Sequence, residues 1–251
     1  MTYYKITRRI LVAVSLLPVG SLYAQEAAQP GENAWRLQLT PYVWMTGLQG
    51  EIRPNHSMPT AHVSQSFSDV LSNLDAAIFL SGTARKGRYV LHGDLTYASV
   101  SDSATLPMGL KGKAEVTQRS MTLLGGYNWG LSSGDNLDIL AGLRWWNIRA
   151  NVQVQPLLQA RVQESFADPI VAARWRHQWD QRWSTLLYTD VGGFGMGSEF
   201  TWQILAALNY QVRDNIFLTA GYRHMSVKYR GGGAHLDVGM GGPVLGATFR
   251  F

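Results

Sequence analysis

The chain has no cysteine among its 251 residues. This absence excludes disulfides, thiolate chemistry, cysteine-ligated zinc and a lipid-modified cysteine. The chain also lacks any apolar run of the roughly 20 residues that a membrane-spanning helix needs. Yet 46% of its residues are hydrophobic and the mean hydropathy is only −0.09. The apolar residues are therefore dispersed among polar ones, in a length that suits one all-β domain.

The most compact apolar stretch lies near the N-terminus. Three basic residues precede a short apolar segment, Ile10–Gly20, and a cleavage site follows at Ala24. This order is typical of a secretory signal peptide, and the apolar segment is short for a retained membrane anchor. Leu22 is larger than the small residue usually preferred there, so cleavage near Ala27 or Ala28 stays open. We expect a signal peptide over residues 1–24.

Removal of residues 1–24 would leave 19 basic and 17 acidic residues, a formal net charge of +2. No run of Lys and Arg interleaved with aromatics appears, so nucleic-acid binding has no support. We expect a polar periplasmic linker over residues 25–33 and a single β-domain over residues 34–251.

Apolar and polar residues alternate in ten stretches of about ten residues, a pattern typical of membrane β-strands. The helical spacing of apolar residues within 66–74 predicts a short helix in the first long connection. The ten stretches are Trp35–Gly47, Ala76–Arg85, Arg88–Val100, Ala114–Trp129, Leu137–Ile148, Pro169–Trp179, Trp183–Phe194, Thr201–Val212, Ile216–Tyr229 and Val238–Phe251.

The connections between these stretches alternate between short polar turns and mostly longer loops. Bacterial outer-membrane barrels have short periplasmic turns, longer extracellular loops and both termini in the periplasm, which requires an even strand number. The predicted fold is therefore an all-β, transmembrane, antiparallel up-and-down β-barrel of ten strands, with eight as the alternative. The predicted location is the outer membrane of a Gram-negative bacterium.

Aromatic residues gather where the predicted strands meet the short turns, as in the aromatic girdle at a membrane interface. They are Trp35, Tyr89, Trp129, Trp179, Trp183 and Tyr210. The last strand ends on Phe249 and Phe251, which share one face. A terminal aromatic on an amphipathic strand resembles the signal that the barrel assembly machinery recognises. The expected partners are thus that machinery, outer-membrane lipid and lipopolysaccharide.

Several segments together resemble an uncharacterised family of Gram-negative outer-membrane β-barrel proteins, often described as porin-like. The segments are Leu39–Trp44, Phe67–Asp75, Ala84–Tyr89, Asp190–Gly195 and Gly242–Gly246. The resemblance spans most of the mature chain. It implies a fold and a location, and it carries no activity and no catalytic residues.

Strand parity directs a set of polar side chains into the lumen. These are Arg36, Gln38, Asp94, Asp138, Arg144, Arg174, Arg176, Asp190, Gln203 and Arg223, together with Asn209, Gln211 and Arg250. A ten-stranded barrel is narrow, so these groups could satisfy one another as a plug. Six arginines against three aspartates could alternatively line a narrow path that favours small anions. The first function hypothesis is therefore a structural barrel or a narrow anion-leaning channel.

Two residue pairs raise the possibility of catalysis. His224 and Ser226 share one strand face, a spacing that resembles outer-membrane lipid A deacylases, so a lipid-ester hydrolase is an alternative function. Val227 stands where those enzymes have Asn. His235 and Asp237 resemble half of an outer-membrane protease site. No histidine has metal-ligand spacing, so no metal and no cofactor is expected. A third hypothesis is a surface-binding module acting through the loop Gln49–Asp75.

Overall fold

The structure is a computed structural model that describes residues 34–53, 60–105, 111–132, 134–155 and 158–251. The predicted signal peptide and linker lie outside these residues. The elements in chain order are β1 (Arg36–Trp44), β2 (Gly47–Arg53), β3 (Ala61–Gln65), α1 (Phe67–Ser72), β4 (Leu74–Lys86), β5 (Tyr89–Thr105), β6 (Lys111–Ser132), β7 (Asp135–Gln155), β8 (Leu158–Gln178), β9 (Trp183–Gly192), β10 (Phe200–Arg213), β11 (Ile216–Gly231) and β12 (Ala234–Arg250).

The strands form one closed antiparallel barrel with ten strand positions in its wall. From β4 to β12 each strand pairs with its neighbour in the chain, and β1 closes the circle by pairing with both β4 and β12. The first wall strand is broken at Met45 and Thr46, so that β2 continues along the same edge of β12. β3 adds outside the closed circle, on the free edge of β2. The prediction of a ten-stranded up-and-down barrel is confirmed.

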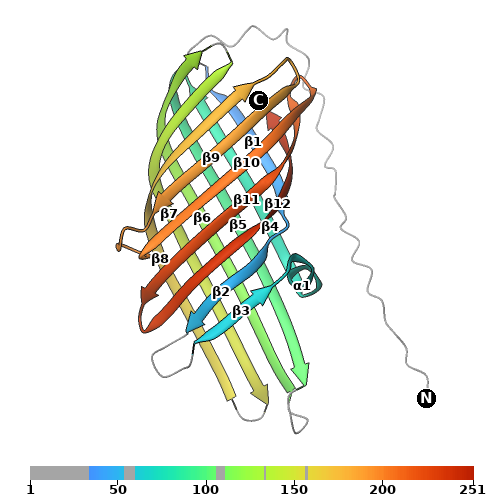
Figure 1. Cartoon of the computed structure of the whole chain (residues 1–251), viewed down its shortest axis with the longest axis vertical. Helices are drawn as coiled ribbons and strands as arrows, with labels where there is room; N and C mark the ends of the chain where they lie inside the picture. Colours follow the sequence, from blue (N-terminus) through green and yellow to red (C-terminus); the bar gives the residue numbers. More distant parts are fainter. Residues whose placement is uncertain (1–33, 54–59, 106–110, 133, 156–157) are drawn as a thin grey trace, which may run out of the picture. The chain divides into compact units, whose positions relative to one another are not determined.

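The two ends of the barrel differ in their connections. At the end that we call the short-turn end, tight connections join β4 to β5, β8 to β9 and β10 to β11, and the chain ends at Phe251. At the opposite, long-loop end lie β2, β3, α1 and the far ends of β5 to β8 (Figure 1). β6, β7 and β8 have 22, 21 and 21 residues, whereas β9 has 10. The long strands therefore project past their neighbours.

The helix predicted in the first long connection is present as α1. Ser66 caps its N-terminus, because its hydroxyl accepts the backbone N–H of Asp69 at 3.3 Å and the Asp69 carboxylate accepts the backbone N–H of Ser66 at 2.9 Å. This reciprocal pair is a capping box. Among the residues that the structure describes, no helix is long and apolar enough to cross a membrane.

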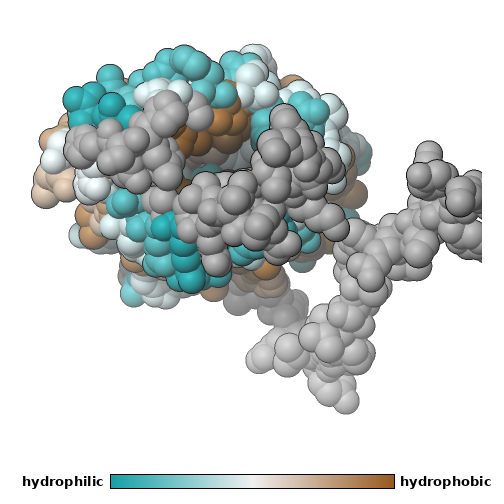
Figure 2. Space-filling view, turned by 90° about the horizontal axis from the view of Figure 1, so that it is seen from below, coloured by the Kyte–Doolittle hydropathy of each residue, from teal (hydrophilic) through white to brown (hydrophobic). Residues whose placement is uncertain are grey.

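The outer face of the barrel is apolar in one band and polar beyond it. On β7 the outward Leu143 and Trp145 are 58% and 43% exposed. Further along β11 the outward side chains are His224, Ser226 and Lys228, while the side chains between them point inward and are buried. The side of the wall that carries the polar residues therefore differs between the two ends of the barrel. Polar residues face the lumen near the short-turn end and face outward at the long-loop end. Figure 2 shows apolar surface inside a polar rim at that end.

Candidate functional site in the barrel lumen

An arginine and an aspartate pair directly in the middle of the lumen. Arg144 on β7 donates from Nη2 to Asp190 on β9 at 2.6 Å and from Nη1 at 3.2 Å. Its Nε donates to Thr122 on β6 at 2.9 Å, and the hydroxyl of Tyr188 donates to Asp190 at 2.7 Å. Arg144 is 1% exposed and Asp190 is 2% exposed. Both charges are therefore paired by forked hydrogen bonds, as burial requires.

A second arginine ties four strands together at the same height. Arg223 on β11 donates to Asp94 on β5 at 3.2 Å, to the hydroxyl of Tyr42 on β1 at 2.7 Å and to Gln203 on β10 at 2.8 Å. The Tyr42 hydroxyl in turn donates to Asp94 at 2.9 Å. This network crosses the lumen, since β1 and β5 lie in one part of the wall and β10 and β11 in another.

The third ionic group lies nearer the short-turn end and holds more positive than negative charge. Asp138 on β7 accepts Arg174 Nε at 2.8 Å, Arg85 Nη1 at 2.9 Å and the Asn128 amide at 2.6 Å. The Nη1 of Arg174 also donates to Thr83 at 3.0 Å. Two guanidinium groups thus share one carboxylate, and Arg174 Nη2 has no hydrogen-bond partner in the described part of the chain.

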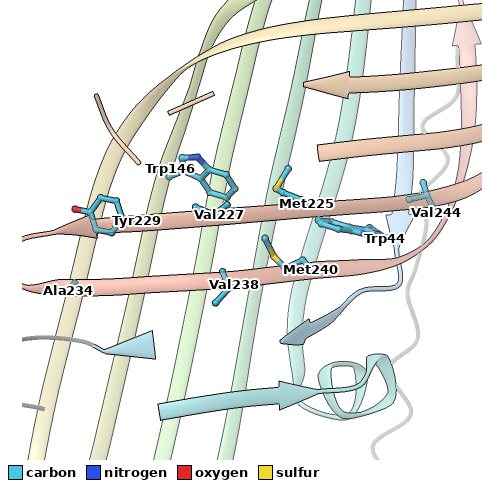
Figure 3. Close-up of a cluster of buried hydrophobic side chains, with 9 residues drawn as sticks. All are labelled: Trp44, Trp146, Met225, Val227, Tyr229, Ala234, Val238, Met240 and Val244. Atoms are coloured by element: carbon cyan, nitrogen blue, oxygen red, sulfur yellow. The ribbon is translucent and has the colours of Figure 1, made fainter. Parts of the chain in front are cut away.

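The long-loop half of the lumen is filled by a cluster that we call the apolar plug (Figure 3). Its side chains come from β1, β7, β11 and β12 and are at most 8% exposed. Phe166 on β8 joins them: its ring stacks on Tyr229 at 4.2 Å and on Trp146 at 6.2 Å. The plug spans the barrel and consists of Trp44, Trp146, Met225, Val227, Tyr229, Ala234, Val238, Met240 and Val244.

Cation–π contacts form the boundary between the plug and the ionic groups. The guanidinium carbon of Arg223 lies 4.7 Å from the ring centre of Trp44, and that of Arg144 lies 5.9 Å from the ring centre of Trp146. Each arginine thereby meets a carboxylate with its nitrogens and an aromatic face with its plane. Beyond this layer most buried side chains are apolar, and the polar atoms of Trp146 and Tyr229 donate to the carboxylates of Asp168 and Glu164.

A cavity of about 120 Å³ remains between the ionic groups and the short-turn end. Its charged lining is Asp94, Arg174, Arg176, Arg223 and Arg250, beside the imidazole of His92. Polar uncharged side chains, including Gln38, Ser184, Asn209, Thr219 and Thr248, complete much of the wall.

The lumen residues predicted from parity occupy three kinds of place. Asp138, Arg144, Arg174, Asp190, Gln203 and Arg223 are buried, and Asp94 joins them through Arg223. Gln38, Arg176, Asn209 and Arg250 line the cavity. Arg36 is exposed at the short-turn end of β1.

Sequence reasoning missed Tyr42, Tyr188 and Arg85 as members of the ionic groups. The signal for the two tyrosines was present, because Tyr42 shares parity with Gln38 and Tyr188 shares parity with Asp190. The Tyr42 hydroxyl bonds to Asp94 and Arg223, and the Tyr188 hydroxyl donates to Asp190.

His224 and Ser226 lie on the outer face of β11, at the level where that face becomes polar. The His224 ring packs against Trp202 on β10 with centres 5.0 Å apart. No hydrogen bond joins His224 to Ser226 or to a carboxylate within the described residues. A groove of about 470 Å³ runs beside His224 and is walled by Tyr222 and by Phe67 of α1. The contacts that activate a serine are therefore not formed here.

The second candidate pair also lies on the outer face. Asp237 is 4.0 Å from the Nζ of Lys228 on the neighbouring strand, and His235 pairs in register with Arg230 and Arg53. A protease site of this kind would need further acidic side chains, and two acids of the first long connection are engaged elsewhere: Asp69 caps α1 and Asp75 accepts the hydroxyl of Ser101. Among the residues described, no group of three or more His, Asp or Glu could hold a metal ion.

A closed ten-stranded antiparallel barrel with an apolar outer band, and polar side chains in the lumen behind that band, is the fold of outer-membrane β-barrel proteins. The chain matches no protein-family model and no curated protein in sequence. It is similar in structure to the outer membrane protease OmpT from Escherichia coli, with TM-score 0.53 and 7% identity over 91% of this chain and 99% of that one.

Two further solved structures are similar at lower scores. The translocator domain of autotransporter NalP from Neisseria meningitidis has TM-score 0.48 and 13% identity, over 86% of this chain and 88% of that one. Ail, the attachment invasion locus protein of Yersinia pestis, has TM-score 0.33 and 10% identity, over 87% and 99%.

Proposed function

We propose that this chain is a Gram-negative outer-membrane β-barrel, exported by a cleaved signal peptide, whose lumen is closed and whose role is structural rather than conductive. The observation that carries the proposal is the apolar plug. Within it the rings of Phe166 on β8 and Tyr229 on β11 stack with centres 4.2 Å apart, which joins two parts of the wall that β9 and β10 separate. Hydrated ions do not cross a dry aromatic layer of this kind without its opening.

The outer face supports the membrane location. On β7 the outward apolar run from Leu137 to Trp145 has the length of a transmembrane β-strand, which needs about 9–11 residues. At the short-turn end Trp35, Trp129 and Trp179 are exposed, as membrane-interface aromatics are. The long-loop end would then face lipopolysaccharide, and the C-terminal Phe249 and Phe251 would serve the assembly machinery.

Single-channel conductance of the refolded mature protein in planar bilayers tests the closed lumen. We expect no steady conductance from protein whose folding is verified by a shift in gel mobility on heating. A steady, anion-biased conductance that Arg144→Ala alters would overturn the proposal and favour the narrow anion-leaning channel. Trp145→Ala, which changes only the outer face, is the matched control.

Surface binding is a second candidate, and strand length favours it. β6, β7 and β8 have about twice the residues that a membrane strand needs. Arg149 pairs with Gln163, so residues 150–162 can be replaced by an Asn-Gly turn without changing the register below. Loss of cell or lipopolysaccharide binding in this variant, with the barrel intact, would support the candidate; unchanged binding would remove it.

The lipid-ester hydrolase has less support from the geometry. His224 packs on an indole instead of bonding Ser226, and no carboxylate of the described chain orients it. Expression of the protein in a suitable host should leave lipid A acylation unchanged. Loss of an acyl chain that depends on Ser226 would revive the hydrolase hypothesis.

A further inference from the structure

The luminal cavity near the short-turn end has an unbalanced charge. Four arginines and one aspartate line it, which leaves a formal excess of three positive charges. The aspartate, Asp94, is already bonded to Arg223 and Tyr42. Asp138, just outside the lining, is shared by Arg85 and Arg174. The pairing therefore leaves the positive charge of Arg176 and Arg250 without a carboxylate.

Arg176 is the most isolated of these charges. It has no hydrogen-bond or ion-pair partner in the described chain. The charges of Arg174, Arg85 and Arg250 repel it, and the carboxylate of Asp138 opposes them only in part. Arg176 and Arg174 are two residues apart on β8, so both point into the lumen. Several positive charges close together in a narrow lumen lower the stability of the protein unless an anion is bound beside them.

The lining of the cavity also includes a buried side chain with an unpartnered donor. Arg174 is 4% exposed and lines the cavity, and its Nη2 has no partner among the described residues. On the opposite wall Arg250 lies over the Phe217 ring at 3.8 Å, and its Nε is likewise without a described partner. Hydroxyl and amide groups of Ser184 and Asn209 lie in the same lining.

We propose that this cavity is a binding site for a small oxyanion, held by Arg176 and Arg250 and by the free Nη2 of Arg174. Guanidinium groups bind carboxylates and phosphates by paired charge-assisted hydrogen bonds. A cavity of 120 Å³ has room for an ion of phosphate or acetate size with some water, since one water needs about 10–15 Å³ by this measure. The lining comes largely from strand ends next to the short turns, so the anion enters from that end.

The test is titration calorimetry of refolded mature protein in a non-ionic detergent, with chloride keeping the ionic strength constant. Inorganic phosphate and acetate are titrated separately, which distinguishes a tetrahedral anion from a carboxylate. We expect saturable binding of one of them. Arg176→Gln should weaken that binding roughly ten-fold or more, the value of one or two hydrogen bonds to a charged group.

Arg213→Gln is the matched control, because Arg213 is exposed at the same end of the barrel, outside the cavity lining. It should leave the affinity unchanged, and Arg250→Gln should weaken it. Absence of saturable binding of either anion to the wild type, or equal affinities for wild type and Arg176→Gln, would overturn the site. Conductance is a separate readout, so the site and the closed lumen can fail independently.

Discussion

Arg144 and Trp146 are two residues apart on β7, point into the same lumen and are each 1% exposed. Arg144 belongs to the half whose outer face is apolar, and Trp146 belongs to the half whose outer face is polar. In the first half the side chains are arranged as in a membrane protein, with polar groups inside. In the second they are arranged as in a soluble β-sheet, with a hydrophobic core inside. The lumen thus changes from polar to apolar at the height where the outer face changes from apolar to polar, which is the arrangement expected of a barrel with one half in lipid and the other in water.

Removal of Arg144 should have the largest effect on this arrangement. Arg144→Ala leaves the carboxylate of Asp190 buried without its guanidinium partner, which costs roughly 3–5 kcal/mol of unfolding free energy. Urea unfolding of the protein refolded in detergent measures the loss. In the double variant Arg144→Ala/Asp190→Ala the loss should be smaller than the sum of the single losses. Additive losses would mean that the pair does not act as a unit.

Truncation of Trp146 should have the next largest effect. Trp146→Ala opens a cavity in the apolar plug and should lower the unfolding free energy by about 3 kcal/mol. Trp145→Ala removes the same side chain from the outer face, where it is 43% exposed, and should cost clearly less. Equal losses at the two positions would contradict a hydrophobic core in the long-loop half. The same urea titration compares them.

The smallest effect concerns α1, which lies outside the barrel wall. Hydrogen bonds from the Ser66 hydroxyl and backbone N–H hold the pKa of the Asp69 carboxyl below its usual value. Because the pKa of Asp69 is lower in the folded than in the unfolded chain, where it is near 4, the ionised carboxylate stabilises α1 at pH values above about 4. This stabilisation is lost as the pH falls through the pKa of the folded state. Amide exchange at residues 67–72 should therefore lose protection below about pH 4. Asp69→Asn should remove this pH step, and an unchanged step would contradict it.

Much of the wall could be predicted from the sequence. The strand number, the short turns and α1 follow from periodicities that the membrane and the helix impose. The ends of β6, β7 and β8 were predicted too short. Past Trp145 the outer face becomes polar, so residues such as Arg149 and Gln163 look like a polar loop although they pair in a strand.

The lumen was harder to predict, because parity shows which side chains point inward but not which ones meet. Arg144 and Asp190 are 46 residues apart, and their contact depends on the stagger of the closed barrel. The apolar plug was missed for a different reason. Met225, Val227 and Tyr229 face inward in the part of β11 whose outward side chains are polar. A membrane strand is expected to carry its apolar residues outward along its whole length, so this reversal is not predicted.

The break in the first wall strand has a consequence for the order of assembly. β2 has two strand partners, β3 and β12, and β12 is the last strand of the chain. The same edge of β12 also receives β1 and so closes the circle. The β2–β3 arm therefore cannot dock on the wall before the final strand is in place. Docking of this arm thus shows that the barrel has closed, although the arm itself belongs to the N-terminal part of the barrel, which is synthesised first.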